Sequence, residues 1–266
     1  MDLHLTGKRA LVTGASSGLG EAIAKAMAAE GADVVVHGRD RARAEAVAAA
    51  VRAAGGTAGT AIGDLTTDAG ADATAEAALA GGPVDILVNN AGVYPSRTWD
   101  EATADDWRDL YETNVISVVR MIKRLLPAMR GRGWGRFIQI GGGLALQPGA
   151  DLPDYNASLA ARHNLTVSLA RELKGSGITS NTVAPGAILV DTAQRHFTGL
   201  AAARGWGETW EEIERKVAEE VVPNDIGRMG RPEEIAAAVL YLSGPLADYV
   251  TGTTLRVDGG TVLGVH

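Results

Sequence analysis

The stretch TGASSGLG, Thr13 to Gly20, follows the apolar run RALV and opens an alanine-rich segment of helical composition. A glycine-rich turn between a strand and a helix directs main-chain N–H groups and the positive end of the helix toward one space. A diphosphate is the ligand that such a space favours. The stretch therefore predicts the first βα unit of a dinucleotide-binding sheet, whose cofactor loop contains Gly14, Ser16, Ser17, Gly18, Leu19 and Gly20.

Short apolar runs of this kind recur along the whole chain, separated by segments rich in Ala, Glu and Arg. Strand and helix in alternation predict a parallel sheet that is covered on both faces, and near-continuous apolarity within each run is typical of such buried strands. We expect an α/β fold, a single-domain Rossmann-type doubly wound parallel sheet with helices on both faces, spanning 1–266. The expected strands are RALVTG (9–14), DVVVHG (33–38), TAGTAIG (57–63), VDILVNN (84–90), RFIQIG (136–141), ITSNTVAPG (178–186) and TTLRVDGG (253–260).

One segment, residues 189–224, interrupts this alternation with two tryptophans and the charged helical stretch EEIERKVAEE. A long excursion between sheet elements is typical of a lid or substrate loop, which we expect here, although a surface helical insertion has the same pattern. Aromatic and apolar side chains in and around this segment are candidates either for an apolar substrate pocket or for core and lid packing: Tyr94, Trp99, Leu146, Trp206 and Trp210.

Composition limits the classes of function. The 266 residues carry a formal net charge of −7 without a run of basic residues, which gives no support for nucleic-acid or membrane-surface binding and favours a small-molecule substrate. There is no cysteine, no signal-peptide pattern in MDLHLTGKRALVTG and no apolar run of the roughly 18 residues that a membrane span needs, so we expect a cytoplasmic protein. The histidines are scattered and predict no metal site.

The end of the second expected strand bears on cofactor choice. An NAD site usually places an acidic residue there, whereas an arginine nearby suits the 2′-phosphate of NADP. Here Gly38 ends the strand and Arg39 follows, while Ser16 in the glycine loop offers a hydroxyl. The pattern favours NADP(H) over NAD(H). Asp40 either pairs with Arg39 or caps the next helix, and Arg39 as a solvated surface charge is the competing interpretation.

Further motifs stand in order along the chain: Asp64-Leu65, NNAG (89–92), Asn114, Pro185-Gly186, GRMGRPEEIA (227–236) and TGTTLRVDGG (251–260). Together with the glycine loop they resemble the short-chain dehydrogenase/reductase family almost from end to end. The resemblance implies a homodimer or homotetramer built on the helices near 105–130 and 153–174. It also implies a threonine near the diphosphate, where this chain has Val190 with Thr192 nearby. The implied cofactor-binding residues are Asp64 and Leu65 at the adenine, Asn90, Ala91 and Gly92 at the adenosine ribose, and Pro185, Gly186 and Ile188 toward the nicotinamide.

The family's catalytic set of asparagine, serine, tyrosine and lysine is incomplete in this chain. By resemblance, Asn114 and Tyr155 are the catalytic residues, but the serine position is Gly142 and the lysine position is Leu159. A nearby cation lowers a tyrosine pKa by roughly 1 to 3 units, so we expect Tyr155 to titrate near or above about 10. A neutral phenol can donate a proton but cannot accept one, which favours reduction over alcohol oxidation.

Two side chains on the same helix are candidates to replace the lysine. Arg162 and His163 lie within about 80° of the direction of Tyr155 but two turns along the axis. Direct contact is not expected at that distance, and a surface or subunit-interface position competes with a role in the site.

Three functions remain open. The first is an NADP(H)-dependent reductase of a carbonyl, imine or activated C=C substrate that needs little acid catalysis. The second is a non-redox enzyme on the same fold, and the third is a cofactor-binding protein without activity. The intact cofactor motifs favour the first and third, and the developed lid favours the first over the third.

Overall fold

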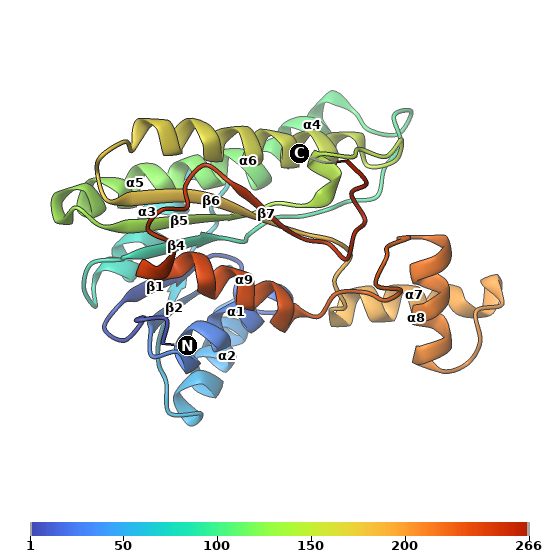
Figure 1. The fold of residues 1–266 in the computed structure, drawn as a ribbon, viewed down its shortest axis with the longest axis horizontal. Coiled ribbons are helices and arrows are strands. Elements are labelled where there is room, and N and C mark those ends of the chain that lie inside the picture. The colour runs from blue at the N-terminus through green and yellow to red at the C-terminus, as the bar shows by residue number, and fades with distance from the viewer. Residues whose placement is uncertain (1, 265–266) are drawn as a thin grey trace.

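A seven-stranded parallel sheet forms the centre of the molecule in the computed structural model, which describes residues 2–264 (Figure 1). The strand order is β3-β2-β1-β4-β5-β6-β7, and every neighbouring pair is parallel. Each of the seven expected runs is confirmed as a strand. The strands are β1 (Arg9–Val12), β2 (Asp33–Gly38), β3 (Thr57–Ile62), β4 (Ile86–Asn89), β5 (Gly135–Ile140), β6 (Ile178–Pro185) and β7 (Thr254–Val257).

Helices cover both faces of this sheet, as expected for a doubly wound fold. One buried apolar cluster joins α1, α2 and α9 to the sheet, and a second joins α3, α5 and α6 to the opposite face. Every residue of β5 and β6 is buried, as expected for strands covered on both faces, although β6 includes the buried polar run Thr179–Thr182. The bounds are α1 (Gly18–Ala29), α2 (Arg41–Ala53), α3 (Asp68–Leu79), α4 (Ala104–Tyr111), α5 (Ser117–Arg132), α6 (Pro153–Glu172) and α9 (Pro232–Ser243).

The strand order reverses direction between β1 and β4, because the chain first builds β1, β2 and β3 outward and then returns to the other side of β1. In an open α/β sheet a ligand binds outside the carboxyl ends of the strands at such a reversal. The glycine loop follows β1 and the NNAG motif follows β4, so both lie at this point. Short turns of helix interrupt the pattern nearby: a π-helix at Glu112–Ile116 between α4 and α5, and 3₁₀ turns at Gly143–Ala145 and Pro245–Ala247.

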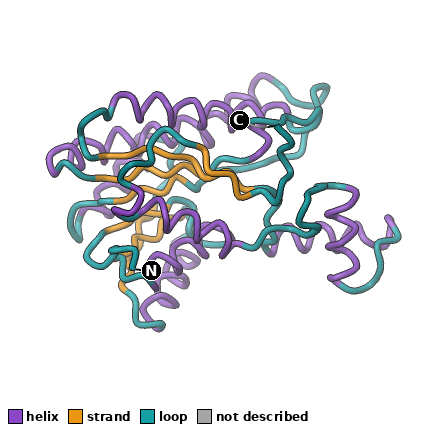
Figure 2. Tube along the Cα trace, in the orientation of Figure 1, coloured by secondary structure: helices purple, strands orange, loops and turns teal. Residues whose placement is uncertain are grey.

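The segment 189–224 forms two helices, α7 (Asp191–Arg204) and α8 (Trp210–Glu220), which project away from the sheet (Figures 1 and 2). They have a small apolar cluster of their own. Trp206 is 3% exposed within this cluster and its indole N–H donates to Glu220 at 3.0 Å, while Trp210 is partly buried against the same cluster. Of the two interpretations of these tryptophans, packing is the one observed, because both rings belong to the apolar cluster of α7 and α8.

No helix within residues 2–264 combines the length and the apolar character needed to cross a membrane.

Candidate active site

The glycine loop fits tightly against the end of β4. Gly14 and Gly18 have positive φ angles of 63° and 57°, a region that side chains other than glycine rarely adopt. A Cβ atom at Gly14 would stand 2.9 Å from Ala91 Cα, and one at Gly20 would stand 2.4 Å from the Gly14 carbonyl oxygen. Ser17 caps α1 without a side-chain hydrogen bond to the helix among the described residues. The loop therefore presents main-chain N–H groups at a helix N-terminus, as a diphosphate requires.

A histidine that the sequence analysis did not select holds this loop in place. His37, in β2, is 3% exposed; its Nδ1 accepts a hydrogen bond from the Gly14 N–H at 3.0 Å, and its Nε2 lies 3.1 Å from the Gly63 carbonyl oxygen. Burial lowers the pKa of His37 to about 4, against the opposing effect of the Gly63 hydrogen bond. A neutral ring with its proton on Nε2 satisfies both contacts. In the sequence, the signal that could have identified His37 was its position as a polar residue in the otherwise apolar run VVVHG.

The end of β2 excludes an acidic side chain. A Cβ atom at Gly38 would stand 2.9 Å from both Cβ and Oγ of Ser16, so any side chain there would displace the glycine loop. Arg39 is exposed, and no carboxylate in residues 2–264 forms an ion pair with it. Asp40 caps α2 by accepting from the Arg43 N–H at 3.1 Å. Of the two roles considered for Asp40, the structure shows the cap.

Of the two residues expected at the adenine, Asp64 is exposed and Leu65 is buried. Asp64 is exposed, and its Oδ1 accepts from the N–H of Thr66 at 3.0 Å and from its hydroxyl at 2.9 Å. These bonds, the main-chain one first, lower the pKa of the Asp64 carboxyl. Leu65 is 5% exposed and belongs to the core, so only its main chain faces the crevice.

The NNAG motif joins β4 to the glycine loop. The Asn90 side-chain amide donates to the carbonyl oxygens of Thr13 at 2.9 Å and Gly14 at 3.1 Å. The Thr13 hydroxyl accepts hydrogen bonds from the N–H groups of Asn90 and Ala91, each at 3.0 Å. A Cβ atom at Gly92 would lie 3.2 Å from Asn114 Oδ1. The Asn90 side chain therefore braces the loop, which leaves main-chain atoms to face a ribose.

The residues expected near the nicotinamide pack closely against the end of the sheet. A Cβ atom at Gly186 would stand 2.9 Å from the Asp258 carbonyl oxygen, just beyond Pro185 at the end of β6. Ile188 forms an isolated bridge with Gly230, and its side chain packs against the core. Val190 contacts Gly18, with its Cγ1 at 3.7 Å from the position of an added Cβ. Val190, and not Thr192, therefore lies against the glycine loop.

Tyr155 lies in the first turn of α6, at the same end of the sheet. Its ring centroid is 6.2 Å from that of Tyr94, at an interplanar angle of 56°, and the Tyr94 hydroxyl is 3.4 Å from Thr192 Oγ1. Burial raises the pKa of Tyr155, the charge of Arg162 lowers it and Tyr94 raises it, for a net increase. Tyr155 is therefore a neutral phenol at neutral pH, and Tyr94 lies between it and the first turn of α7.

The positions of the missing serine and lysine contact one another. Leu159 is 3% exposed, one helical turn after Tyr155, and its Cδ1 would lie 3.0 Å from a Cβ atom at Gly142. The wall of the site behind Tyr155 is thus apolar where the family pattern has a hydroxyl and an ammonium group.

Asn114 lies in the π-helix between α4 and α5 and is 1% exposed. Its Oδ1 accepts from the Val93 N–H at 2.9 Å, and its amide donates to the Val93 carbonyl at 2.9 Å and to Ser158 Oγ at 3.1 Å. The side chain therefore supports the loop after β4. Its main-chain carbonyl, at a π-turn of the kind often found at functional sites, accepts from Nε of Arg162.

Of the positions considered for Arg162, the surface one was wrong, because the side chain is buried; its hydrogen bonds within residues 2–264 go to main-chain carbonyls and not to Tyr155. Arg162 is 3% exposed, and besides Asn114 it donates to the carbonyls of Ile140, at 2.8 Å, and Ala91. Helical side chains lean toward the N-terminus of their helix, so a long arginine on the inward face reaches back toward Tyr155. His163 is buried against Gly141 instead, where burial and then the Arg162 charge lower its pKa to about 4.

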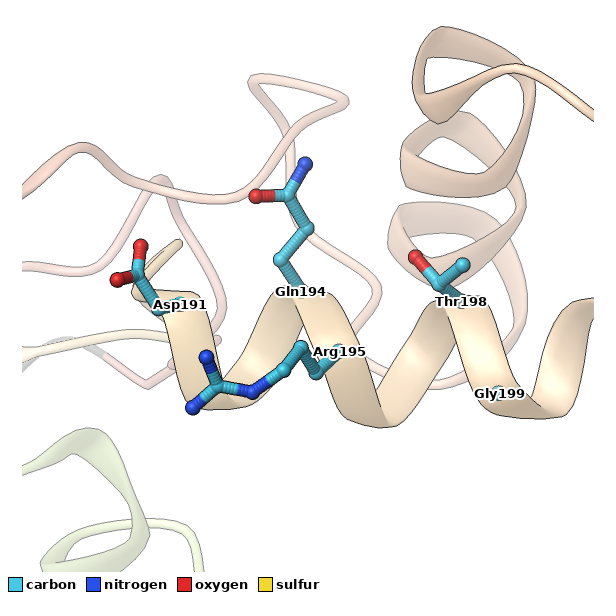
Figure 3. Close-up of a pocket in the computed structure, with 5 residues that line it drawn as sticks. All are labelled: Asp191, Gln194, Arg195, Thr198 and Gly199. Atoms are coloured by element: carbon cyan, nitrogen blue, oxygen red, sulfur yellow. The ribbon is translucent and has the colours of Figure 1, made fainter.

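A separate open hollow of about 620 Å³ lies along α7 (Figure 3). Its lining comes entirely from that helix: Asp191, Gln194, Arg195, Thr198 and Gly199. Tyr155 does not line it, so this surface is distinct from the crevice at the end of the sheet. Within residues 2–264, no group of three or more His, Cys, Asp or Glu side chains is arranged to hold a metal ion.

Comparison with known proteins agrees with this architecture. The family described as short chain dehydrogenase matches residues 8–200. The uncharacterized oxidoreductase YvaG of Bacillus subtilis is 36% identical over the whole of both chains. The L-sorbose reductase of Gluconobacter frateurii, solved with NADPH and L-sorbose, superposes with a TM-score of 0.93 at 34% identity and full coverage of both chains. A 3-oxoacyl (acyl-carrier-protein) reductase of Agrobacterium tumefaciens with NADP bound has a TM-score of 0.86 at 37% identity, covering 97% of this chain and 96% of its own.

Proposed function

Since this chain belongs to the short-chain dehydrogenase/reductase family, we propose that it is an NADP(H)-dependent oxidoreductase that works as a reductase of a carbonyl, imine or activated C=C substrate. The observation that carries this proposal is the position of a half-buried neutral phenol, Tyr155, at the strand ends where the glycine loop lies. We assign the whole of 1–266 to one domain with residues 189–224 as its lid.

The preference for NADP(H) rests on the end of β2. Ser16 occupies the space that an acidic side chain at Gly38 would need, which disfavours the usual arrangement for an NAD ribose. Arg39 is exposed beside this point, and a guanidinium binds phosphate with two parallel hydrogen bonds. The two similar solved proteins that contain NADPH and NADP support the same choice.

The remaining residues of the crevice are proposed to hold the cofactor mainly through their main chain. The N–H groups from Ser16 to Gly20 take the diphosphate, and the exposed Asp64 faces the adenine. The main chain of Leu65 and of the NNAG segment lines the adenosine, while the turn from Pro185 to Ile188 lines the nicotinamide. When bound, NADPH supplies the hydride.

The protein's own part in the reaction is proton donation and exclusion of water. Tyr155 donates its phenolic proton to the atom that gains negative charge as the substrate is reduced. Gly142 cannot offer a hydroxyl to this substrate atom, and Leu159 carries no charge. Tyr155 is therefore the proposed proton donor. A neutral imine or an enone, which takes up one proton together with the hydride, suits this site better than an unactivated ketone; an iminium becomes a neutral amine on hydride transfer and needs no proton from Tyr155. Because the phenol is neutral, the reverse reaction, alcohol oxidation, is disfavoured at neutral pH.

We also propose that the chain forms a homodimer or homotetramer through the faces of α5 and α6, as the family resemblance implies. Exposed apolar side chains at Ile116, in the π-helix just before α5, and at Val167, on α6, are consistent with such a contact.

Two measurements on the purified protein test the function. Fluorescence titration with NADPH and NADH gives the cofactor, and single-turnover oxidation of bound NADPH against ketones, enones and cyclic imines gives the reaction. Tight NADPH binding with turnover of imines or enones is the expected result. NADPH binding without turnover of any class favours the binding-only alternative, and failure to bind either dinucleotide favours the non-redox one.

A further inference from the structure

Arg162 is a buried cation without a buried anion. It is 3% exposed, and no carboxylate of residues 2–264 pairs with it; its hydrogen bonds go to main-chain carbonyls. An unpaired buried charge costs several kcal/mol and is retained where the charge has a use. Burial accordingly lowers the pKa of Arg162 to about 10, and Tyr155 is the one group that counteracts this effect. The guanidinium remains charged at neutral pH.

The three carbonyls that Arg162 binds belong to the three segments around Tyr155. Asn114 lies in the π-helix, Ile140 ends β5 and Ala91 lies in the loop after β4. The fork of a guanidinium suits several acceptors in fixed directions, which an ammonium group cannot match. One side chain therefore fixes these segments relative to α6 and places its own charge at their meeting point.

Neighbouring residues accommodate this arrangement. Gly92 leaves space for the guanidinium, since a Cβ atom there would lie 3.4 Å from Nη2. Leu159 and Gly142 fill the adjacent wall with apolar groups, so no second cation of the helix competes with Arg162 at this point. The site thus lacks a lysine at position 159 but has an arginine one turn further along the same helix.

We propose that Arg162 is a positioning residue of the active site, which supplies from behind Tyr155 the positive charge that the family pattern assigns to position 159. This inference rests on the proposed role of Tyr155 as proton donor. In contrast to a lysine at position 159, Arg162 is committed to main-chain carbonyls and acts on the phenol through its field. Its charge makes Tyr155 a stronger acid than burial alone would allow.

The other titratable groups around Tyr155 do not supply this charge. Tyr94, from the loop after β4, faces the ring and raises the pKa of Tyr155. His163 faces Gly141, and burial keeps it neutral. Arg97 forms ion pairs with Asp154, at the start of α6, at 3.3 Å, and with Asp106, in α4, at 3.0 Å.

Two variants separate the charge from the hydrogen bonds. Arg162→Lys keeps a positive charge and gives up the fork, whereas Arg162→Gln keeps hydrogen-bonding capacity and removes the charge. The titration of Tyr155 is measured without cofactor by phenolate absorbance, as the difference between each protein and its Tyr155→Phe counterpart. The expected result is a shift to higher pH in Arg162→Gln. A buried lysine loses its charge in the alkaline range where Tyr155 titrates, so Arg162→Lys is compared only at neutral pH, by kinetics. This readout requires no turnover, so it stands even if the proposed reductase function fails.

The second readout is kinetic. At neutral pH, kcat of imine or enone reduction is expected to fall roughly tenfold or more in Arg162→Gln, a part of the 10²- to 10⁴-fold effect of a positioned acid, and to recover partly in Arg162→Lys. NADPH affinity is the control for an intact cofactor site. An unchanged Tyr155 titration in Arg162→Gln would overturn the proposal and leave Arg162 as a structural brace. If Arg162→Gln does not fold, Arg162→Met takes its place in the same titration, with the same expected and contrary results.

Discussion

The side chain of Leu159 lies against Gly142, with its Cδ1 at 3.0 Å from the position of a Cβ atom added to that glycine. These are the two positions at which the chain departs from the family's catalytic set, so the departures are complementary in shape. Restoring the serine at position 142 alone therefore conflicts with Leu159.

Gly142→Ser is therefore expected to destabilise the protein by roughly 1–3 kcal/mol, since overpacking a filled site has a cost of that size. In the Leu159→Ala background the same change should have a smaller cost, because the obstructing Cδ1 is gone. Urea unfolding of the two single variants and the double variant measures this coupling. Gly131→Ser, at a helix position with no neighbouring atom within 4 Å of an added Cβ, is the matched control. Additive costs would show that the contact is not tight.

At the end of β2, Gly38→Asp is expected to weaken binding of both NADPH and NADH. It is not expected to change the cofactor preference to NADH. The new Cβ meets Ser16 at 2.9 Å and displaces the glycine loop. Ser16→Gly combined with Gly38→Asp removes that conflict and should bind NADH better than Gly38→Asp does. Dissociation constants from fluorescence titration decide the point, and conversion by Gly38→Asp alone contradicts it.

Arg39→Leu is expected to weaken NADPH binding by about 10- to 100-fold and to leave NADH binding nearly unchanged, since a hydrogen bond to a charged group contributes about 1.5–3 kcal/mol. The lost partner is the 2′-phosphate, which NADH lacks. Arg171→Leu, at an exposed position near the far end of α6, controls for the change in net charge. An equal loss for both cofactors would argue against a phosphate contact at Arg39.

Stability is expected to fall as the pH drops from about 6.5 toward 4. The folded-state pKa of His37 is lowered to about 4 by burial, so the unfolded chain binds its proton first and folding stability is lost across this interval. His163, also lowered to about 4, acts in the same direction. Each contributes up to ~3 kcal/mol at neutral pH relative to low pH.

The free energy of unfolding against pH, compared between the wild type and His37→Gln, tests the His37 part. The variant should show a flatter profile, and exposed His196→Gln should not. Because Nδ1 of His37 accepts the Gly14 N–H, NADPH affinity of the folded wild type should weaken only as the pH approaches about 4, where the folded His37 takes up its proton. Parallel profiles for wild type and His37→Gln would exclude this role.

Trp206→Ala is expected to open the lid while the sheet stays folded. The lid has its own apolar cluster, and truncating a buried tryptophan has a cost of about 3–5 kcal/mol. Trypsin cleavage after Arg204, at the end of α7, should become faster, with the far-ultraviolet signal of the sheet and its flanking helices retained. Trp99→Ala, at a side chain 67% exposed, is the control. Loss of the whole fold would show that the lid and the sheet unfold together.

The sequence by itself determined the fold and its cofactor crevice. Seven short runs rich in apolar residues, alternating with helical segments, predict seven parallel strands, because strands buried on both faces have no solvent-facing polar side. The glycines of Thr13–Gly20 predict a close approach of the main chain, and at Gly14 and Gly20 a Cβ has no space. The family resemblance identified Gly142 and Leu159 as departures from the catalytic pattern.

Only the tertiary structure decided what surrounds Tyr155. Helical periodicity places Arg162 two turns from the tyrosine, but it does not show that the arginine lies inward or that carbonyls from three other segments converge on it. His37 similarly becomes a brace only when β3 and the glycine loop are placed on either side of it. Patterns along one chain report local geometry, whereas a buried charge and its acceptors are brought together by the packing of elements distant in sequence.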